Sequence, residues 1–239
     1  MDNSFLIEEA YNQEYGVVQH ISTFARNDDL DAWSATFTQE WPLGSQRNQL
    51  GFTLPYMREG DSGGIGDIAL HYRRQLREIH PQLAISPRFS VMLPTGRSEG
   101  GFGKGSPGLE VALPVSYILN DHFYAHTNGG MTLTPTAKAP NGSETAIFET
   151  FIGQSLVWLA HPRLNLLLEL AWDTEETPLS NGAVLRSENF FLSPGVRGAI
   201  NLSSGMQIVP GIAIPIGVGP SRGDRAVFLY LSVEHAFRR

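Results

Sequence analysis

The chain has 239 residues, a net charge of −7 and a mean hydropathy of −0.13. No apolar run approaches the roughly 18 residues of a membrane-spanning helix, which excludes a helical membrane protein but not a β-barrel, whose strands alternate in polarity. The acidic balance argues against nucleic acid as a partner, and the absence of cysteine excludes disulfides and thiolate metal sites.

Residues 1–15 are acidic, with a few apolar anchors and no clear period. This predicts an N-terminal segment separate from the sheet that follows, with a short amphipathic helix as the alternative. No apolar leader follows Met1, so the chain is either cytoplasmic or a mature form with an added initiator methionine; we favour the second.

From Gly16 onward, most of the chain alternates between apolar and polar residues. In the stretch 33–41, Trp33, Phe37 and Trp41 share one face of an extended chain, and the two tryptophans bracket its apolar stripe. Lipid–water interfaces select aromatic residues at both ends of such a band. Twelve strands of roughly 10–13 residues are expected, over residues 16–26, 33–41, 47–56, 66–76, 83–94, 108–119, 122–137, 146–160, 164–172, 188–200, 206–218 and 226–237.

The connections between these strands alternate in length. Those after odd-numbered strands, such as 58–64, 95–107, 138–145 and 174–187, are longer and more polar than those after even-numbered strands, such as 161–163. This parity predicts a transmembrane, up-and-down antiparallel β-barrel of residues 16–239, with short periplasmic turns and longer extracellular loops. Residues 1–15 would then lie on the periplasmic side, at the barrel mouth.

Two observations bear on alternatives to this fold. The last strand, AVFLYLSVEHAF, has an apolar face and ends near an aromatic residue, which is typical of a closing barrel strand but also fits the edge strand of a soluble β-sandwich. Several prolines fall in or near predicted strands, and proline cannot donate to a sheet ladder. Pro55 and Pro94 fit strand ends, whereas Pro114, Pro194 and Pro210 require bulges or kinks.

Several segments resemble an outer-membrane family known as "MetA-pathway of phenol degradation". They include FTQEWPLGSQRNQLGFTLPY at 37–56, GIGDIALHYRRQL at 64–76 and QIVPGIAIPIGVGPS at 207–221, and the resemblance covers nearly the whole chain. It implies a Gram-negative outer-membrane transporter linked to aromatic compounds, without catalytic residues. Arg238 and Arg239, which follow the terminal aromatic Phe237, depart from the closing-strand pattern.

The inward face of such a barrel carries polar residues of both charge signs. We expect these to line a pore: Glu40, Gln49, Asp67, His71, Arg73, Arg88, Glu110, His126, Asn128, Asn165, Glu169, Arg197, Gln207 and Glu234. The alternative for each is a place in a salt-bridged network that fills a narrow barrel, because buried charges must be paired.

No catalytic, cofactor or metal site is expected. Barrel lipid hydrolases place a serine two residues after an outward-facing histidine, but Asn128 occupies that place after His126 and cannot attack an ester; only Ser155 could approach from the next strand. Asp28, Asp29, Asp31 and Asp61 could bind Ca²⁺ in loops, although solvated surface charge is commoner.

The sequence thus predicts a channel in the outer membrane for passive or facilitated uptake of small solutes, including aromatic or hydrophobic compounds. Its partners would be outer-membrane lipid, lipopolysaccharide and the solute. A plugged structural or partner-binding barrel is the main alternative, followed by a barrel hydrolase and a soluble binding module.

Overall fold

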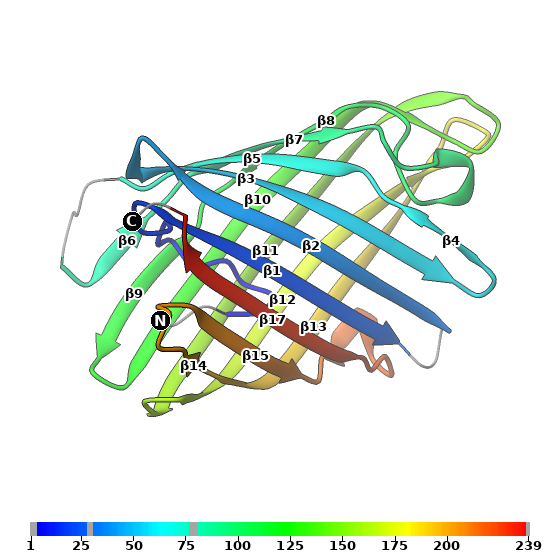
Figure 1. Ribbon diagram of the computed structural model, residues 1–239. Helices are drawn as coiled ribbons and strands as arrows, with labels where there is room; N and C mark the ends of the chain where they lie inside the picture. Colours follow the sequence, from blue (N-terminus) through cyan, green and yellow to red (C-terminus); the bar gives the residue numbers. More distant parts are fainter. Residues whose placement is uncertain (1–3, 28–30, 77–80, 238–239) are drawn as a thin grey trace.

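The computed structural model describes residues 4–27, 31–76 and 81–237. They form a closed antiparallel β-barrel of twelve strands, which confirms the predicted fold class (Figure 1). Helical structure among them comprises two 3₁₀ turns, η1 (Ser98–Gly100) and η2 (Gly219–Ser221), and none of the described residues forms a helix able to cross a membrane. The predicted loop residues Asp28 and Asp29, and Arg238 and Arg239, lie outside the described ranges.

Each barrel strand pairs with its neighbours in sequence, and four barrel strands are split into two shorter ones. The continuous strands are β1 (Val17–Asn27), β2 (Ala32–Leu43), β3 (Ser45–Glu59), β10 (Phe123–Lys138), β11 (Glu144–His161), β12 (Leu164–Pro178), β13 (Val184–Gly198), which β14 (Ile200–Asn201) extends, and β17 (Val227–Ala236). The split strands are β4 (Ser62–Ile65) with β5 (Ile68–Arg74), β6 (Leu83–Ile85) with β7 (Arg88–Leu93), β8 (Gly108–Ala112) with β9 (Val115–Asn120), and β15 (Gln207–Ala213) with β16 (Ile216–Gly217).

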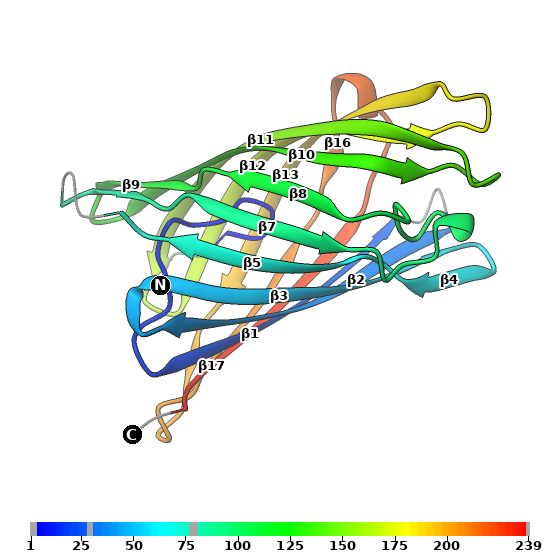
Figure 2. The ribbon, with the colours of Figure 1, turned by 90° about the horizontal axis from the view of Figure 1, so that it is seen from above.

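The barrel closes where β1 pairs with β17. Their register runs unbroken from Val17 opposite Ala236 to Arg26 opposite Val227. We call this pairing the seam, the end of the barrel at Val17 and Ala236 the terminal rim, and the opposite end the loop rim. Figure 2 shows β4, and the loop between β7 and β8 with its 3₁₀ turn, at the loop rim.

The apolar stripes predicted from the sequence face outward. On β12, Leu168 is 47% exposed, whereas the neighbouring Glu169 is fully buried on the inward face. Aromatic pairs lie at both ends of the stripe on β2 and β3, where Trp33 stacks on Tyr56 and Trp41 contacts Phe52. An apolar outer belt around a closed sheet is the surface that hydrocarbon requires, because lipid offers the backbone no hydrogen bonds.

Several strands are longer than the expected 10–13 residues, and three predicted loops are wrong for this reason. β11 has 18 residues, and β12 continues through Pro178 into the expected loop 174–187. Likewise, β3 and β4 occupy most of the expected loop 58–64, and β10 and β11 shorten the loop 138–145. These extensions lack a regular apolar stripe. The β12 extension pairs with β13 along its whole length, whereas its ladder with β11 ends at Phe151 and Asp173, beyond which side chains accept backbone hydrogen bonds.

Of the bulges or kinks predicted at Pro114, Pro194 and Pro210, the bulges are wrong, because the register with the neighbouring strands is unchanged across all three. Proline has no backbone N–H to donate, and at each of these prolines the neighbouring strand is interrupted close by. Ser86 N donates to the carbonyl of Pro114 at 3.0 Å where both β6/β7 and β8/β9 are interrupted, and Ile214 N donates to Pro194 at 3.0 Å just before β16.

Pro94 directly follows β7, as predicted, but Pro55 lies inside β3 rather than at its end. The register of β3 with its partner shifts by one residue between β4 and β5, at Gly66 and Asp67. Gly66 N donates to the carbonyl of Pro55 at 2.9 Å. The bulge therefore lies on the strand opposite the proline and turns Asp67 into the barrel mouth.

The outer belt can be tested by placing a charge at two depths on neighbouring strands. We expect Leu168→Arg, in the middle of the β12 stripe, to lower the free energy of unfolding, measured for the protein in lipid vesicles, by about 2–4 kcal/mol. Leu185→Arg, on the β13 extension near the loop rim and 58% exposed, is the control and should cost about 0–1 kcal/mol. Equal costs at the two positions would contradict a belt that ends below the extensions.

Candidate functional site

The most distinctive feature of the interior is a length of chain inside the barrel. Residues 4–15, which we call the plug segment, run through the lumen as irregular chain with neither helix nor strand (Figures 1 and 2). The alternative of an amphipathic helix is therefore wrong. The segment lies deeper than the barrel mouth, where the sequence placed it, because its contacts come from the walls of the lumen.

One carboxylate holds the first turn of the plug segment. The backbone N–H groups of Phe5, Leu6 and Ile7 all donate to Glu169 Oε1, at 3.0, 3.0 and 3.1 Å. Glu169 is fully buried on β12. Beside it, Ser4 Oγ donates to Ser155 Oγ on β11 at 2.6 Å. Three converging N–H donors form a small anion nest, so a buried carboxylate fixes the local path of the chain.

Two arginines of the wall bind the middle of the plug segment. Arg73, buried on β5, donates to Glu8 Oε1 at 2.6 Å, to Asn12 Oδ1 at 2.8 Å and to two backbone carbonyls of the segment. Arg88 on β7 pairs with Glu8 at 2.7 Å and with Glu110 at 2.8 Å. Glu8 therefore bridges two arginines of the wall, and such pairing offsets the cost of burying charge.

Neutral side chains complete the anchoring. Ala10 N donates to Ser116 Oγ at 2.8 Å and the carbonyl of Ala10 accepts a hydrogen bond from Ser86. Gln13 N donates to Gln49 Oε1 at 2.7 Å. These bonds satisfy the segment's backbone with wall side chains instead of with a sheet ladder.

Apolar side chains of the plug segment fit sockets made by small wall residues. The Phe5 ring packs against Phe228 and Tyr230, with centroids 5.9 and 5.1 Å away. A Cβ atom at Gly195 would lie 2.7 Å from the Phe5 ring, and one at Gly211 would overlap it. The side chain of Ile7 occupies the space over Gly153 in the same way. The lumen is therefore apolar at this level, which the sequence analysis did not predict.

The structure distributes the predicted pore-lining residues among the plug contacts and four cavities. Gln49, Arg73, Arg88 and Glu169 contact the plug segment directly. Glu40 and His71 line a cavity of about 350 Å³ beside the segment, and Glu234 and Gln207 line another, of about 580 Å³. His126 and Asn128 are buried within the wall of β10.

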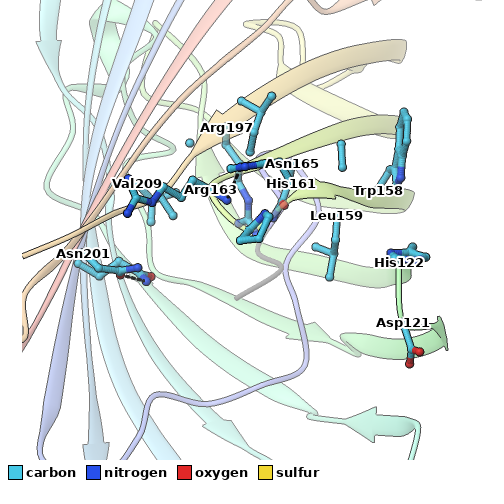
Figure 3. A pocket seen from close by; sticks show the side chains of 16 residues that line it. Asp121, His122, Trp158, Leu159, His161, Arg163, Asn165, Arg197, Asn201 and Val209 are labelled. Atoms are coloured by element: carbon cyan, nitrogen blue, oxygen red, sulfur yellow. Dashed lines mark hydrogen bonds between the residues drawn. The ribbon is translucent and has the colours of Figure 1, made fainter.

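The remaining predicted residues lie at the two rims. At the terminal rim, Asn165, Arg197 and Gln207 line a cavity of about 750 Å³ together with the turns 121–122 and 161–163 (Figure 3). At the loop rim, Asp67 and Glu110 line a cavity of about 480 Å³. The predicted residues are thus spread along the barrel axis and do not form one cluster.

The loop between β7 and β8 folds over the loop rim. Asp67 accepts hydrogen bonds from Gly96 N at 2.9 Å and Lys104 N at 2.8 Å, and Lys104 pairs with Glu149 on β11 at 2.8 Å. The loop carries Phe102, which is buried, into the loop-rim cavity. The predicted long connection 95–107 is therefore tied to both sides of the barrel mouth.

His126 lacks the placement that a barrel lipid hydrolase needs. It is fully buried and faces inward, and its Nδ1 lies 2.7 Å from Ser116 Oγ. Ser155 does lie opposite His126 in the ladder, but its hydroxyl accepts the hydrogen bond from Ser4. Neither group reaches the outer face, where a lipid would lie. Among the described residues no cluster of three or more His, Cys, Asp or Glu side chains could hold a metal ion.

Comparison with known proteins supports the architecture. No protein-family model and no curated protein matches the chain. An outer-membrane channel from Pseudomonas putida F1 superposes with a TM-score of 0.75 and 12% identity, over 95% of this chain and 98% of that one. The NanC porin (TM-score 0.59) and the KdgM porin, solved with disordered oligogalacturonate (0.55), are each 7% identical over 92% of this chain and 100% and 99% of theirs.

At these identities the structural matches show the fold alone, a closed β-barrel like those of the solved channel and porins. The resemblance to the phenol-degradation family stays a prediction, while the barrel that it implied is confirmed.

The anchoring role of Glu169 has a direct test. Because hydrogen bonds to a charged group contribute about 1.5–3 kcal/mol each, we expect Glu169→Ala to lower the free energy of unfolding by at least about 2 kcal/mol. Hydrogen exchange at the amides of Phe5, Leu6 and Ile7 should accelerate. Glu149→Ala, which breaks the ion pair at the loop rim, should leave those amides protected; unchanged exchange in Glu169→Ala would contradict the assignment.

Proposed function

We propose that this protein is a channel of the Gram-negative outer membrane that admits small solutes, and that the plug segment closes its lumen at rest. The observation that carries the proposal is a closed barrel with an apolar belt outside and a polar, cavity-containing interior. A pore needs both, because lipid requires the apolar outer belt and a hydrated solute requires the polar interior. The terminal rim, with its short turns, would face the periplasm and the loop rim the exterior.

The contacts that bind the plug segment support the proposal that this segment can leave the lumen and open the channel. Its contacts with the wall are hydrogen bonds and ion pairs to side chains, and ring packing in glycine sockets. Displacing residues 4–15 would therefore leave the sheet ladders intact. A solute or a partner that competes for Arg73 and Arg88 would weaken the hold on Glu8 and shift the equilibrium toward the open state.

The finer part of the proposal is the solute class, aromatic or hydrophobic small molecules. The loop-rim cavity supports it, because Met57, Met92 and Phe102 give that cavity an apolar wall. Methionine and aromatic side chains adapt to flat apolar ligands of differing shape. Lipid and lipopolysaccharide would surround the outer belt.

A second candidate function is a permanently plugged barrel with a structural or partner-binding role. Two sets of contacts favour this function: the ion pairs of Glu8 with Arg73 and Arg88, and the three N–H groups that donate to Glu169. All of these contacts would be lost if the plug segment left the lumen.

The two functions are separated by conductance in planar bilayers. We expect the intact protein to show low conductance and a variant lacking residues 4–13 to show large steady channels, because the deletion removes the filling of the lumen and leaves the ladders in place. Uptake of aromatic acids and of sugars into liposomes would then rank the solutes. Silence of the deletion variant, with its barrel shown to be folded by circular dichroism, would favour the structural role.

A milder change should open the channel without shortening the chain. Gly195→Ala together with Gly211→Ala places methyl groups against both sides of the Phe5 ring, which Phe228 and Tyr230 also confine. We expect the open fraction in single-channel records to rise by about tenfold, which corresponds to roughly 1.4 kcal/mol.

Gly129→Ala is the matched control for the two glycine substitutions, because its added Cβ meets only the carbonyl of Phe151 at 3.9 Å. It should keep the conductance of the intact protein. An increase in Gly129→Ala as large as that in the double variant would show that loosening of the sheet, rather than loss of the socket, causes the opening.

A further inference from the structure

Two histidines meet on the outer face of the seam. His20 lies on β1 opposite Val233, and His235 lies on β17 opposite Val18, so the two imidazoles reach each other diagonally across the ladder. Their Nε2 atoms are 3.2 Å apart, although the residues are separated by 215 positions in the chain. Neither residue takes part in binding the plug segment.

The hydrogen bonding of His235 to the backbone leaves its Nε2 atom as an acceptor, which faces His20 Nε2. His235 Nδ1 lies 3.2 Å from the carbonyl oxygen of Ala236. Since a carbonyl oxygen can only accept, Nδ1 carries the proton and the lone pair of the ring is on Nε2. An Nδ1–H bonded to a backbone carbonyl is also the arrangement that orients histidine ligands in metal sites.

The two rings lie in a shallow, open groove on the outer surface. Val18, beneath the two rings, is only 6% exposed although it faces outward. The rings line an external groove of about 390 Å³ together with Gln39, Trp41 and Phe237. The amide of Gln39, opposite His20 on β2, adds an oxygen donor to the same groove. Its position at the terminal rim keeps the groove near water.

We propose that His20 and His235 form a binding site for one divalent transition-metal ion of the zinc class. Two imidazole nitrogens of a tetrahedral ion with bonds of about 2.0–2.1 Å are about 3.3 Å apart, which is close to the observed separation. The rings swing to aim both lone pairs at the ion, and His20 takes the tautomer with its proton on Nδ1. The amide oxygen of Gln39 and a water molecule complete the four-coordinate shell.

The ion would act as a clip across the seam. It would join the first and the last strand of the barrel, and a link between residues so far apart in the chain restricts the unfolded state strongly. The inward neighbours of the same strands, Gln19 and Glu234, are already joined by a hydrogen bond of 2.9 Å. The metal ion would therefore link β1 and β17 on the outer face, beside the Gln19–Glu234 hydrogen bond that links them on the inner face.

The test is a titration of ZnCl₂ into the full-length protein in detergent micelles, with any affinity tag removed, followed by calorimetry. We expect one ion per barrel. His20→Ala and His235→Gln should each weaken binding by about tenfold or more, since loss of even an outer-shell partner of a metal site costs that much. His122→Ala, in the turn after β9, removes a different histidine of the terminal rim and should bind as the intact protein does.

A second readout separates metal binding from loss of packing. At the same zinc concentration, zinc should raise the midpoint of thermal unfolding of the intact protein and of His122→Ala by more than that of His20→Ala or His235→Gln. Absence of zinc binding by the intact protein would overturn the proposal and leave a hydrogen-bonded histidine pair only. Unchanged affinity in both seam variants would overturn it equally.

Discussion

The constraint on which this structure depends is that lipid offers the peptide backbone no hydrogen bonds. Every N–H and C=O within the apolar belt must find its partner in the protein, and the pairing of β1 with β17 removes the last two free edges. The same constraint explains the prolines. Pro87 and Pro114 lie at facing interruptions of adjacent strands, and Pro194, within the continuous β13, lies opposite the interruption between β15 and β16 that contains Pro215.

Closure has a consequence for the interior. Alternation along each strand puts polar groups inward wherever apolar groups face out, and charges in a narrow lumen must be paired. The wall provides some of these partners, such as Glu110 for Arg88, and the plug segment provides others. Glu8 supplies the carboxylate for Arg73 and Arg88, and the backbone at Phe5–Ile7 supplies the donors for Glu169. Wall and plug segment therefore satisfy each other, which explains how irregular chain can be buried.

The sequence predicts what is local and misses what is distant. The period of two in strands such as 164–172 is a property of neighbours in the chain, so the twelve strands and their inward faces could be predicted. The polar extensions beyond the belt, such as 174–178, carry no such period. The contacts of the plug segment could not be predicted, because Glu169 lies 163 positions from Leu6 and the segment has no repeat. The seam histidines, still farther apart, left no local signal.

The inward glycines show what the lumen was shaped to hold. Glycine in a strand sacrifices packing and backbone order, and a wall meant only to be filled would carry larger side chains at these positions. Instead, Gly195 and Gly211 make room for Phe5, and Gly153 makes room for Ile7. Side chains of the plug segment, rather than side chains of the wall, therefore fill the lumen at this level. Their contacts with the wall use none of the backbone hydrogen bonds that pair the strands. In a barrel with this division between wall and filling, displacement of the plug segment would require no strand pairing to break.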